Sequence, residues 1–196
     1  MYGRKILGGP MGHIYFVRHG QTVWNVENKI CGATDSPLTE LGHAQAIETG
    51  NMIKEMGLEI DEILYSPLSR ARDTALHISE IIGVEAKEEP RLIEQRFGKW
   101  EGTPRNGAEF QAAKREFVTR NGGGESMMQM AQRIYNLLDE CRAESDEKTY
   151  MLVAHNGIAR IVNSYFNEMS NEEFASFGIK NCQVVEFVFD DNIQMK

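Results

Sequence analysis

The chain has 196 residues, which is enough for one hydrophobic core and cramped for two. Its 29 acidic residues outnumber its 21 basic residues, and the formal net charge is −8. This charge disfavours nucleic acid and anionic membranes as partners, so a small anionic substrate would need a local cluster of cations.

The chain also lacks the patterns of secreted and membrane proteins. No apolar run approaches 18 residues, and the basic residues at positions 4 and 5 are followed by only two apolar residues before a glycine pair. Cys31, Cys141 and Cys182 are widely spaced and form neither a CxxC pair nor a zinc-ligand cluster. We therefore expect reduced, buried thiols in a cytoplasmic protein.

In the first half of the chain, apolar runs alternate with segments of helical period. The runs Ile14–Val17 and Ile63–Tyr65 are typical of strands buried on both faces. Apolar residues at helical spacing follow Thr39 and Ser69, and each set predicts a helix with one buried face. The two sets are Leu41, Ala44 and Ile47, with a slip around Gly50, and Ala71, Ala75, Ile78 and Ile82.

The second half repeats this alternation after the longest irregular stretch, residues 102–107. A short helix is expected next, before the glycines at 122–124. Ser126 and Gln129 form a capping box that opens a helix with a core stripe from Met127 to Cys141. Two further buried strands are expected at Tyr150–Ala154 and Val184–Phe189. Between them, Ser170 and Glu173 open a short helix.

Strands that alternate with helices predict an α/β protein. The expected architecture is a three-layer α/β/α sandwich with a mostly parallel central sheet and helices on both faces. No repeat, low-complexity tract or boundary interrupts residues 1–196, so we expect a single domain. Residues 1–12 lack periodicity and form an irregular lead-in whose native origin the sequence leaves open.

Polar side chains follow three of the predicted strands. Arg18 and His19 come directly after the first strand, Arg70 follows the second through a Ser-Pro turn, and His155 follows the strand that ends at Ala154. Ligands of open α/β sheets bind beyond the carboxyl ends of the strands. We therefore expect these two histidines and two arginines to converge on one site.

Such a site matches a phosphoryl dianion, because arginine forks and helix N-termini donate hydrogen bonds to phosphate oxygens. Arg18 and Arg70 are expected to lower the pKa of His19, which keeps one ring nitrogen free to attack phosphorus while a carbonyl holds the other. The arginines and His155 would stabilise the charge on the transferring group.

The leaving oxygen also needs a proton donor, and Glu94 is the candidate. Its apolar neighbours and a bound dianion favour the acid form of a carboxyl group. Glu101 and Glu40 are weaker candidates. The alternative for Glu94 is a salt bridge with Arg91 or Arg96.

Other functions for these side chains are disfavoured. His19 could be a loop histidine with a satisfied hydrogen bond, and Arg70 an ordinary arginine on a helix surface. His13, His43 and His77 lie outside the strand ends and are read as structural. Two histidines and a carboxylate could hold a metal, but flanking arginines would repel a cation, so we expect no metal and no cofactor.

Several blocks carry a resemblance to a known family. Arg18-His19-Gly20-Gln21-Thr22-x-x-Asn25 resembles the phosphohistidine signature of the histidine phosphatase superfamily, which includes cofactor-dependent phosphoglycerate mutase. Residues 35–42, 66–75, 94–102 and 155–160 resemble further blocks in the family's order. The match runs from about Ile14 to Phe189 and is closest to the small bacterial phosphatase branch.

The resemblance implies roles for individual residues. His19 would become the phosphohistidine, and Glu94 would be the proton donor and then the base for water. The phosphoryl group would be held by Arg18, Arg70 and His155. The same pocket would be lined by Gln21, Thr22 and Asn25. Asn156 stands where the family usually has glycine, and it either contacts substrate or caps the following helix.

The preferred function is a phosphomonoester hydrolase acting on a small phosphorylated metabolite. The alternatives are a phosphoglycerate mutase-type transfer within one substrate and a catalytically silent phosphate-binding module. The segment between Glu101 and Ser126 would cover the pocket. It contains Arg105, Lys114, Arg115 and Arg120 but not the adjacent arginine pair that mutases of this family carry there for the substrate carboxylate, so hydrolysis is favoured. The physiological substrate and the oligomeric state stay open.

Overall fold

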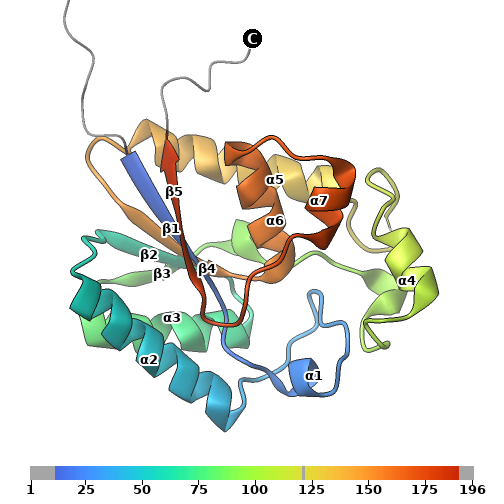
Figure 1. The fold of residues 1–196 in the computed structure, drawn as a ribbon, viewed down its shortest axis with the longest axis horizontal. Helices are drawn as coiled ribbons and strands as arrows, with labels where there is room; N and C mark the ends of the chain where they lie inside the picture. The colour runs from blue at the N-terminus through green and yellow to red at the C-terminus, as the bar shows by residue number, and fades with distance from the viewer. Residues whose placement is uncertain (1–11, 121, 190–196) are drawn as a thin grey trace, which may run out of the picture.

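Most of the central sheet forms from the apolar runs of the sequence, and its topology is that of an α/β protein (Figure 1). A computed structural model describes residues 12–120 and 122–189. Within these ranges the strand order is β3-β2-β4-β1-β5. The parallel strands are β1 (Gly12–Arg18), β2 (Glu62–Tyr65), β3 (Ala86–Glu88) and β4 (Tyr150–Ala154), and β5 (Val184–Phe189) runs antiparallel to β1.

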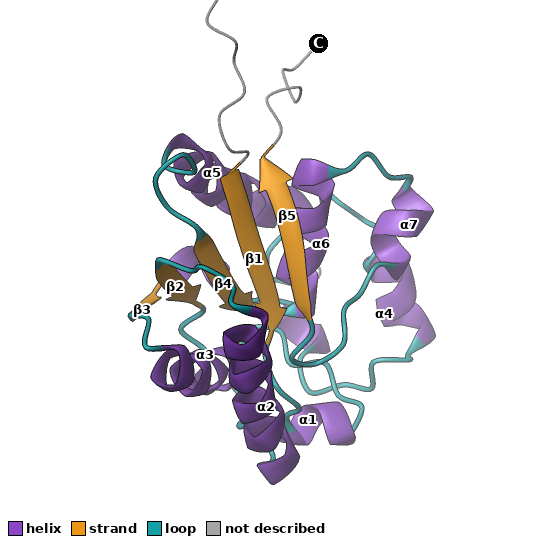
Figure 2. Cartoon of the chain, turned by 60° about the vertical axis from the view of Figure 1, so that its left-hand side comes forward, coloured by secondary structure: helices purple, strands orange, loops and turns teal. Residues whose placement is uncertain are grey.

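Successive side chains of the central strands face opposite sides of the sheet, and each side has its own core. Phe16 and Leu152 pack with α5 (Met127–Ala143) and α6 (Asn156–Phe166). Val17 and Val153 pack with α2 (Glu40–Met56) and α3 (Ser69–Ile82). Figure 2 shows the two helix pairs on opposite sides of the strands. The predicted three-layer α/β/α architecture is confirmed.

The shorter elements connect these layers. They are α1 (Val23–Val26), η1 (Pro90–Leu92), η2 (Gly98–Trp100), α4 (Ala108–Ala113) and α7 (Asn171–Ser176). The capping box predicted at Ser126 is present, the helix predicted to open at Ser170 also begins with a capping box, and the stripe from Met127 to Cys141 is buried as expected. All three cysteines are free and buried. Within the described ranges, no helix is long and apolar enough to cross a bilayer.

The predicted buried face of α2 is wrong. Leu41 and Ile47 are 53% and 43% exposed. The helix instead buries small residues, including Ala46 and Gly50, against α3. A Cβ added at Gly50 would lie 2.8 Å from Ile81 Cδ1. The absence of a side chain at Gly50 lets the two helices approach closely, and this close packing decides which face of α2 is buried.

The strand predictions differ from the structure at the edges of the sheet. Every residue of β4 is buried, as expected, but β5 is a partly exposed edge strand whose Glu186 faces His13 and Tyr15. Strand β3 has the sequence Ala-Lys-Glu, which carries no apolar signal, and it was not predicted. Strand β1 begins at residue 12, inside the predicted lead-in; residues 1–11 lie outside the described ranges.

Candidate active site

The ends of β1, β2 and β4 bring the predicted catalytic side chains together. Arg18 pairs in register with Ala154, and the His19 N–H donates to the Ala154 carbonyl at 2.9 Å. At the end of β2, the Ser66 N–H donates to the Val153 carbonyl at 3.1 Å, and the chain continues from there toward α3. As a result, the ring centroids of His19 and His155 lie 5.2 Å apart.

His19 is held in one orientation by the backbone. Its Nδ1 lies 2.7 Å from the Gly20 carbonyl oxygen. Because a carbonyl only accepts, Nδ1 carries the proton and Nε2 has the free lone pair. Burial, followed by the charges of Arg70 and Arg18, holds the pKa of His19 well below its usual value. The predicted direction of the pKa shift is confirmed, although burial contributes more than the arginines.

The turn after His19 is fixed by both helices on one face of the sheet. The Gly20 N–H donates to the Thr74 hydroxyl of α3 at 3.0 Å, and that hydroxyl donates to the Arg70 carbonyl. A Cβ added at Gly20 would lie 2.5 Å from the Gly42 carbonyl oxygen of α2. Glycine is therefore required here because the backbones of the turn and of α2 are nearly in contact.

Arg70 is only 1% exposed, and its guanidinium has a fixed direction. Nη2 donates to the Gly32 carbonyl at 2.7 Å, and Nη1 donates to the Thr34 carbonyl at 3.0 Å. Burial lowers its pKa. An arginine with both ends bound to carbonyls is a preorganised cation for an anionic ligand.

Arg18 is oriented from the other side of the site. Its Nη1 donates to the Ile179 carbonyl at 2.7 Å. Its Nε is buried and makes no hydrogen bond to any residue that the structure describes. Burial and the nearby Arg105 charge lower the pKa of Arg18 to about 10. It therefore stays charged at neutral pH, and the unpartnered N–H is a donor available to an anion.

His155 is fully buried, and both of its ring nitrogens have protein partners. Arg70 Nε donates to Nδ1 at 3.3 Å, and Nε2 lies 2.7 Å from the Ser66 hydroxyl. Since Nδ1 accepts, the ring proton is on Nε2 and points to Ser66. Burial, Arg70 and His19 hold the pKa of His155 well below its usual value. A direct bond from Nε2 to a phosphoryl oxygen thus requires exchange of the Ser66 partner.

Glu94 is 8% exposed and is held by backbone donors. Its Oε2 accepts from the Gly157 N–H at 3.0 Å, and its Oε1 accepts from the Gln95 N–H at 2.9 Å. A Cβ at residue 157 would lie 2.3 Å from Oε1, so glycine there makes room for the carboxylate. Among the described residues, Arg91 pairs with other carboxylates and neither it nor Arg96 pairs with Glu94.

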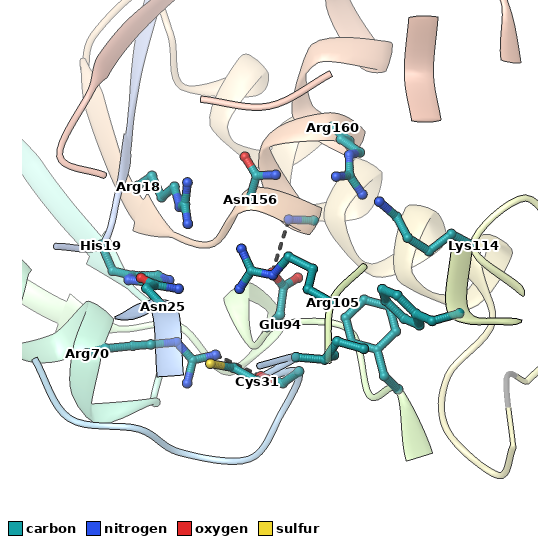
Figure 3. A pocket seen from close by; sticks show the side chains of 15 residues that line it. Arg18, His19, Asn25, Cys31, Arg70, Glu94, Arg105, Lys114, Asn156 and Arg160 are labelled. Atoms are coloured by element: carbon teal, nitrogen blue, oxygen red, sulfur yellow. Dashed lines mark hydrogen bonds between the residues drawn. The ribbon is translucent and has the colours of Figure 1, made fainter. Parts of the chain in front are cut away.

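Arg18, His19, Arg70 and Glu94 line one pocket, and Figure 3 shows its layout. His155, which was predicted to hold the phosphoryl group, is not among the residues that line this pocket. Arg18, His19 and Arg70 lie on one side, Arg160 and Lys114 on the other, and Glu94 and Arg105 between them. The pocket contains five basic side chains, namely Arg18, Arg70, Arg105, Lys114 and Arg160. Its apolar wall includes Ile30, Phe97 and Phe110. The pocket therefore contains the local cluster of cations that an anionic substrate would need in a protein of negative net charge.

The outer part of this cluster was not assigned from the sequence. Arg105 Nη2 donates to the Lys29 carbonyl at 3.1 Å, and Arg160 Nε donates to the Phe177 carbonyl at 2.8 Å. Burial, together with the charges of Arg160 and Arg105, lowers the pKa of Lys114 to about 8. The sequence gives only an indirect signal for these cations, because Arg105 and Lys114 lie in the segment expected to cover the pocket and Arg160 ends the last of the motif blocks.

The predicted substrate-binding residues divide into two pairs. Asn25 and Asn156 line the pocket. The structure does not place Gln21 and Thr22 in the pocket lining. Thr22 is buried and caps α1 by accepting from the Asn25 N–H at 3.1 Å, while the Gln21 side chain accepts from Thr39 at 3.0 Å.

Asn156 and Glu101 have structural partners that the sequence did not predict. Asn156 Oδ1 accepts from the Ile179 N–H at 2.9 Å, which ties the start of α6 to the segment before β5. Glu101 does not line the pocket, and its carboxylate accepts from backbone N–H groups of residues 33, 34 and 97. Among residues 12–120 and 122–189, no three His, Cys, Asp or Glu side chains are grouped to hold a metal ion.

Comparison with known proteins identifies the family. The sequence profile of the histidine phosphatase superfamily (branch 1) matches residues 14–194. The chain belongs to this superfamily. The probable phosphoglycerate mutase GpmB of Erwinia tasmaniensis is 33% identical over 182 residues, which cover 89% of this chain and 83% of that protein. The GpmB protein of Escherichia fergusonii is 36% identical over 156 residues, 76% of this chain and 71% of its own length.

Solved structures of bacterial phosphatases show the same fold. A mycobacterial glucosyl-3-phosphoglycerate phosphatase in complex with VO3 aligns with a TM-score of 0.77 at 27% identity, over 89% of this chain and 90% of that chain. A putative alpha-ribazole-5'-P phosphatase from Escherichia coli aligns with a TM-score of 0.79 over 92% of both chains, and at 21% identity it supports the fold alone. The resemblance inferred from the sequence motifs is confirmed.

Proposed function

We propose that this histidine phosphatase hydrolyses phosphomonoesters of small metabolites through a phosphohistidine formed on His19. The observation that carries the proposal is the state of the His19 ring. Nδ1 is bound to the Gly20 carbonyl, and Nε2 has no hydrogen-bond partner among the described residues. The ring lines a pocket that also contains Arg18, Arg70 and Glu94, so a nucleophile, two cations and a proton donor share one space.

In the first step, the Nε2 lone pair attacks phosphorus. The P–N bond forms as the ester P–O bond breaks, and the leaving oxygen takes the proton of Glu94 to become an alcohol. Arg18 and Arg70 bind the oxygens of the transferring group, on which charge is spread. Because both guanidiniums are already held by backbone carbonyls, little reorganisation is needed as charge develops.

In the second step, the Glu94 carboxylate takes a proton from water. The water oxygen attacks phosphorus, the P–N bond breaks, and the electron pair returns to His19 Nε2. Inorganic phosphate leaves, and Glu94 is again protonated for the next cycle. The Gly157 and Gln95 N–H groups hold the Glu94 carboxylate in one place for both proton transfers.

The outer cations support a substrate with a second negative group. Arg105, Lys114 and Arg160 line the same pocket as the phosphoryl-binding arginines, and Glu94 is the one carboxylate among the described lining residues. Three further positive charges exceed what one phosphoryl group requires. We therefore propose that the preferred substrates are phosphomonoesters that also carry a carboxylate or a second phosphate.

The outer cations would also suit the carboxylate of a phosphoglycerate, so the mutase reaction is the second candidate. The probable phosphoglycerate mutases of Erwinia tasmaniensis and Escherichia fergusonii are 33% and 36% identical to this chain over the aligned residues. A mutase would use every residue above but return the phosphoryl group from His19 to another hydroxyl of the substrate. The two reactions differ only in whether water or a sugar-acid hydroxyl reaches phosphorus.

The test is a phosphate-release assay over a panel of phosphomonoesters, without added metal and with a chelator control. The panel pairs 3-phosphoglycerate with glycerol 3-phosphate, which lacks the carboxylate. His19→Ala is compared with wild type, and His13→Ala serves as a control histidine in a surface pair with Glu186. A parallel assay follows conversion of 3-phosphoglycerate to 2-phosphoglycerate.

Each outcome assigns a different function. Phosphate release that resists chelator, disappears in His19→Ala and persists in His13→Ala supports the hydrolase. Isomerisation without release supports the mutase. Silence in both assays, with retained phosphate binding, supports a phosphate-binding module and contradicts the proposed reaction.

A further inference from the structure

Glu101 lies outside the pocket but connects two of its walls. Oε1 accepts from the Phe97 N–H at 2.9 Å and from the Ala33 N–H at 3.2 Å. Oε2 accepts from the Thr34 N–H at 2.8 Å and also from the Thr34 hydroxyl. One carboxylate thus satisfies four donors from two segments that are more than 60 residues apart in the chain.

The segment that Glu101 binds is the one that orients Arg70. Arg70 Nη2 donates to the Gly32 carbonyl and Nη1 to the Thr34 carbonyl. The N–H groups of residues 33 and 34 point to Glu101, while the carbonyls of residues 32 and 34 point to Arg70. The short loop 32–34 is therefore held between a carboxylate on one side and a guanidinium on the other.

Gly32 lets the carboxylate approach this closely. Its φ of +56° lies in the left-handed region, and an added Cβ would lie 2.4 Å from Glu101 Oε1. The backbone beside the loop is tied to the same neighbour. The Gly102 N–H donates to the Ile30 carbonyl at 2.8 Å, and the Ile30 N–H donates to the Thr103 carbonyl at 3.0 Å. These contacts fix the position of Glu101 relative to the loop independently of its side chain.

We propose that Glu101 is a positioning residue for Arg70, acting through loop 32–34, and that phosphoryl binding depends on its negative charge. The inference rests on the proposed function in one respect, namely that Arg70 binds the phosphoryl group. A carboxylate is required because all four partners are donors. A glutamine would turn an NH₂ group toward donors on one side, so the loop would move and the two carbonyls that hold Arg70 would move with it.

The experiment measures the Kd of inorganic phosphate by calorimetry, together with the melting temperature, for Glu101→Gln and for the control Glu173→Gln. Glu173 also accepts from a backbone N–H, that of Ser170 at the start of α7, but among the described residues its side chain makes no hydrogen bond to loop 32–34. We expect Glu101→Gln to raise the phosphate Kd about tenfold, because it disturbs charge-assisted hydrogen bonds. Glu173→Gln is expected to leave the Kd unchanged.

A double-mutant cycle with Arg70→Lys separates positioning from a general effect on the fold. Lysine keeps a positive charge but lacks the planar fork with which Arg70 reaches the two carbonyls from two separate nitrogens. In the Arg70→Lys background, Glu101→Gln should therefore change the Kd less than twofold. An equal increase in both backgrounds, or a Kd in Glu101→Gln no higher than in Glu173→Gln, would overturn the inference.

A milder variant covers the case in which Glu101→Gln does not fold. Thr34→Val removes the hydroxyl donor to Glu101 and keeps the backbone N–H, and we expect it to raise the phosphate Kd two- to threefold; an unchanged Kd counts against the proposal. Calorimetry needs no turnover, so this result is separate from the proposed reaction. A wild-type protein that binds phosphate but releases none from any ester would contradict the hydrolase and leave the role of Glu101 standing.

Discussion

The two buried histidines should make the folded protein less stable in mild acid. Burial and neighbouring arginines hold the pKa values of His19 and His155 well below 6.5, whereas an unfolded chain takes up these protons near pH 6.5. Below that pH the unfolded state binds more protons than the folded state. The free energy of unfolding therefore falls as the pH drops through 6.5, and it is unaffected by these groups above that pH.

The size of the loss follows from proton linkage. At pH 5.0 each unfolded histidine gains up to about 2 kcal/mol from protonation, so the pair lowers the free energy of unfolding by up to about 4 kcal/mol. That is a large part of the roughly 5–15 kcal/mol expected for a domain. Ion-paired carboxylates such as Glu89 have lowered pKa values, and their contribution is lost only in stronger acid.

Urea unfolding at pH 7.5 and pH 5.0 provides the assay, with wild type compared with His19→Asn. The asparagine amide can replace the Nδ1–H bond to the Gly20 carbonyl, but it does not titrate. We expect the variant to lose about 2 kcal/mol less than wild type between the two pH values. The same loss in both proteins would refute the reasoning, because it would show that His19 does not remain neutral in the folded state.

Three further predictions concern activity. Since the pKa of Lys114 is lowered to about 8, kcat/KM for 3-phosphoglycerate should fall above pH 8. Lys114→Arg should move this fall to higher pH, because arginine keeps its charge there. An identical pH profile in the variant would show that Lys114 does not bind the substrate. Gly157→Ala should lower kcat about 100-fold in a steady-state assay, because the new Cβ displaces the Glu94 carboxylate. The control Gly107→Ala should leave kcat unchanged, because its Cβ would lie 3.4 Å from the Pro104 carbonyl oxygen, an ordinary contact distance. Similar kcat values for the two variants would contradict the role of Glu94. Because the pKa of His19 is held well below 6.5, the nucleophile stays neutral in mild acid, and a pH–rate profile should show no loss of kcat from protonation of His19 near pH 6.5; a loss of kcat centred at that pH would argue against a neutral His19.

The sequence predicted the parts of the site that depend on strand ends. Arg18, His19 and His155 follow apolar runs directly, and parallel strands bring their carboxyl ends to one edge of the sheet. The capping boxes at Ser126 and Ser170 were equally readable, because each depends on residues only three positions apart.

The predictions that were wrong or missing concern contacts between segments that are distant in the sequence. The buried face of α2 is set by how closely α3 approaches, which the local pattern of Leu41 and Ile47 does not encode. The outer cations lie at the C-cap of α4, in α6 and in a loop, and no local motif marks where those segments meet. The sequence neighbourhood of Glu101 suggests a weak candidate acid, whereas its partners at residues 33 and 34 are brought to it only by folding.

The segment between α7 and β5 has a consequence for synthesis of the protein. Ile179 accepts from the Arg18 guanidinium, and the Asn181 amide donates to the His19 carbonyl at 2.8 Å, so residues late in the chain complete a site that begins at its first strand. A nascent chain that has been translated through residue 155 already contains both histidines. The Arg18 guanidinium, however, lacks its bond to the Ile179 carbonyl until residue 179 has left the ribosome. The site that begins at β1 is therefore complete only after residues 179–181 have been translated.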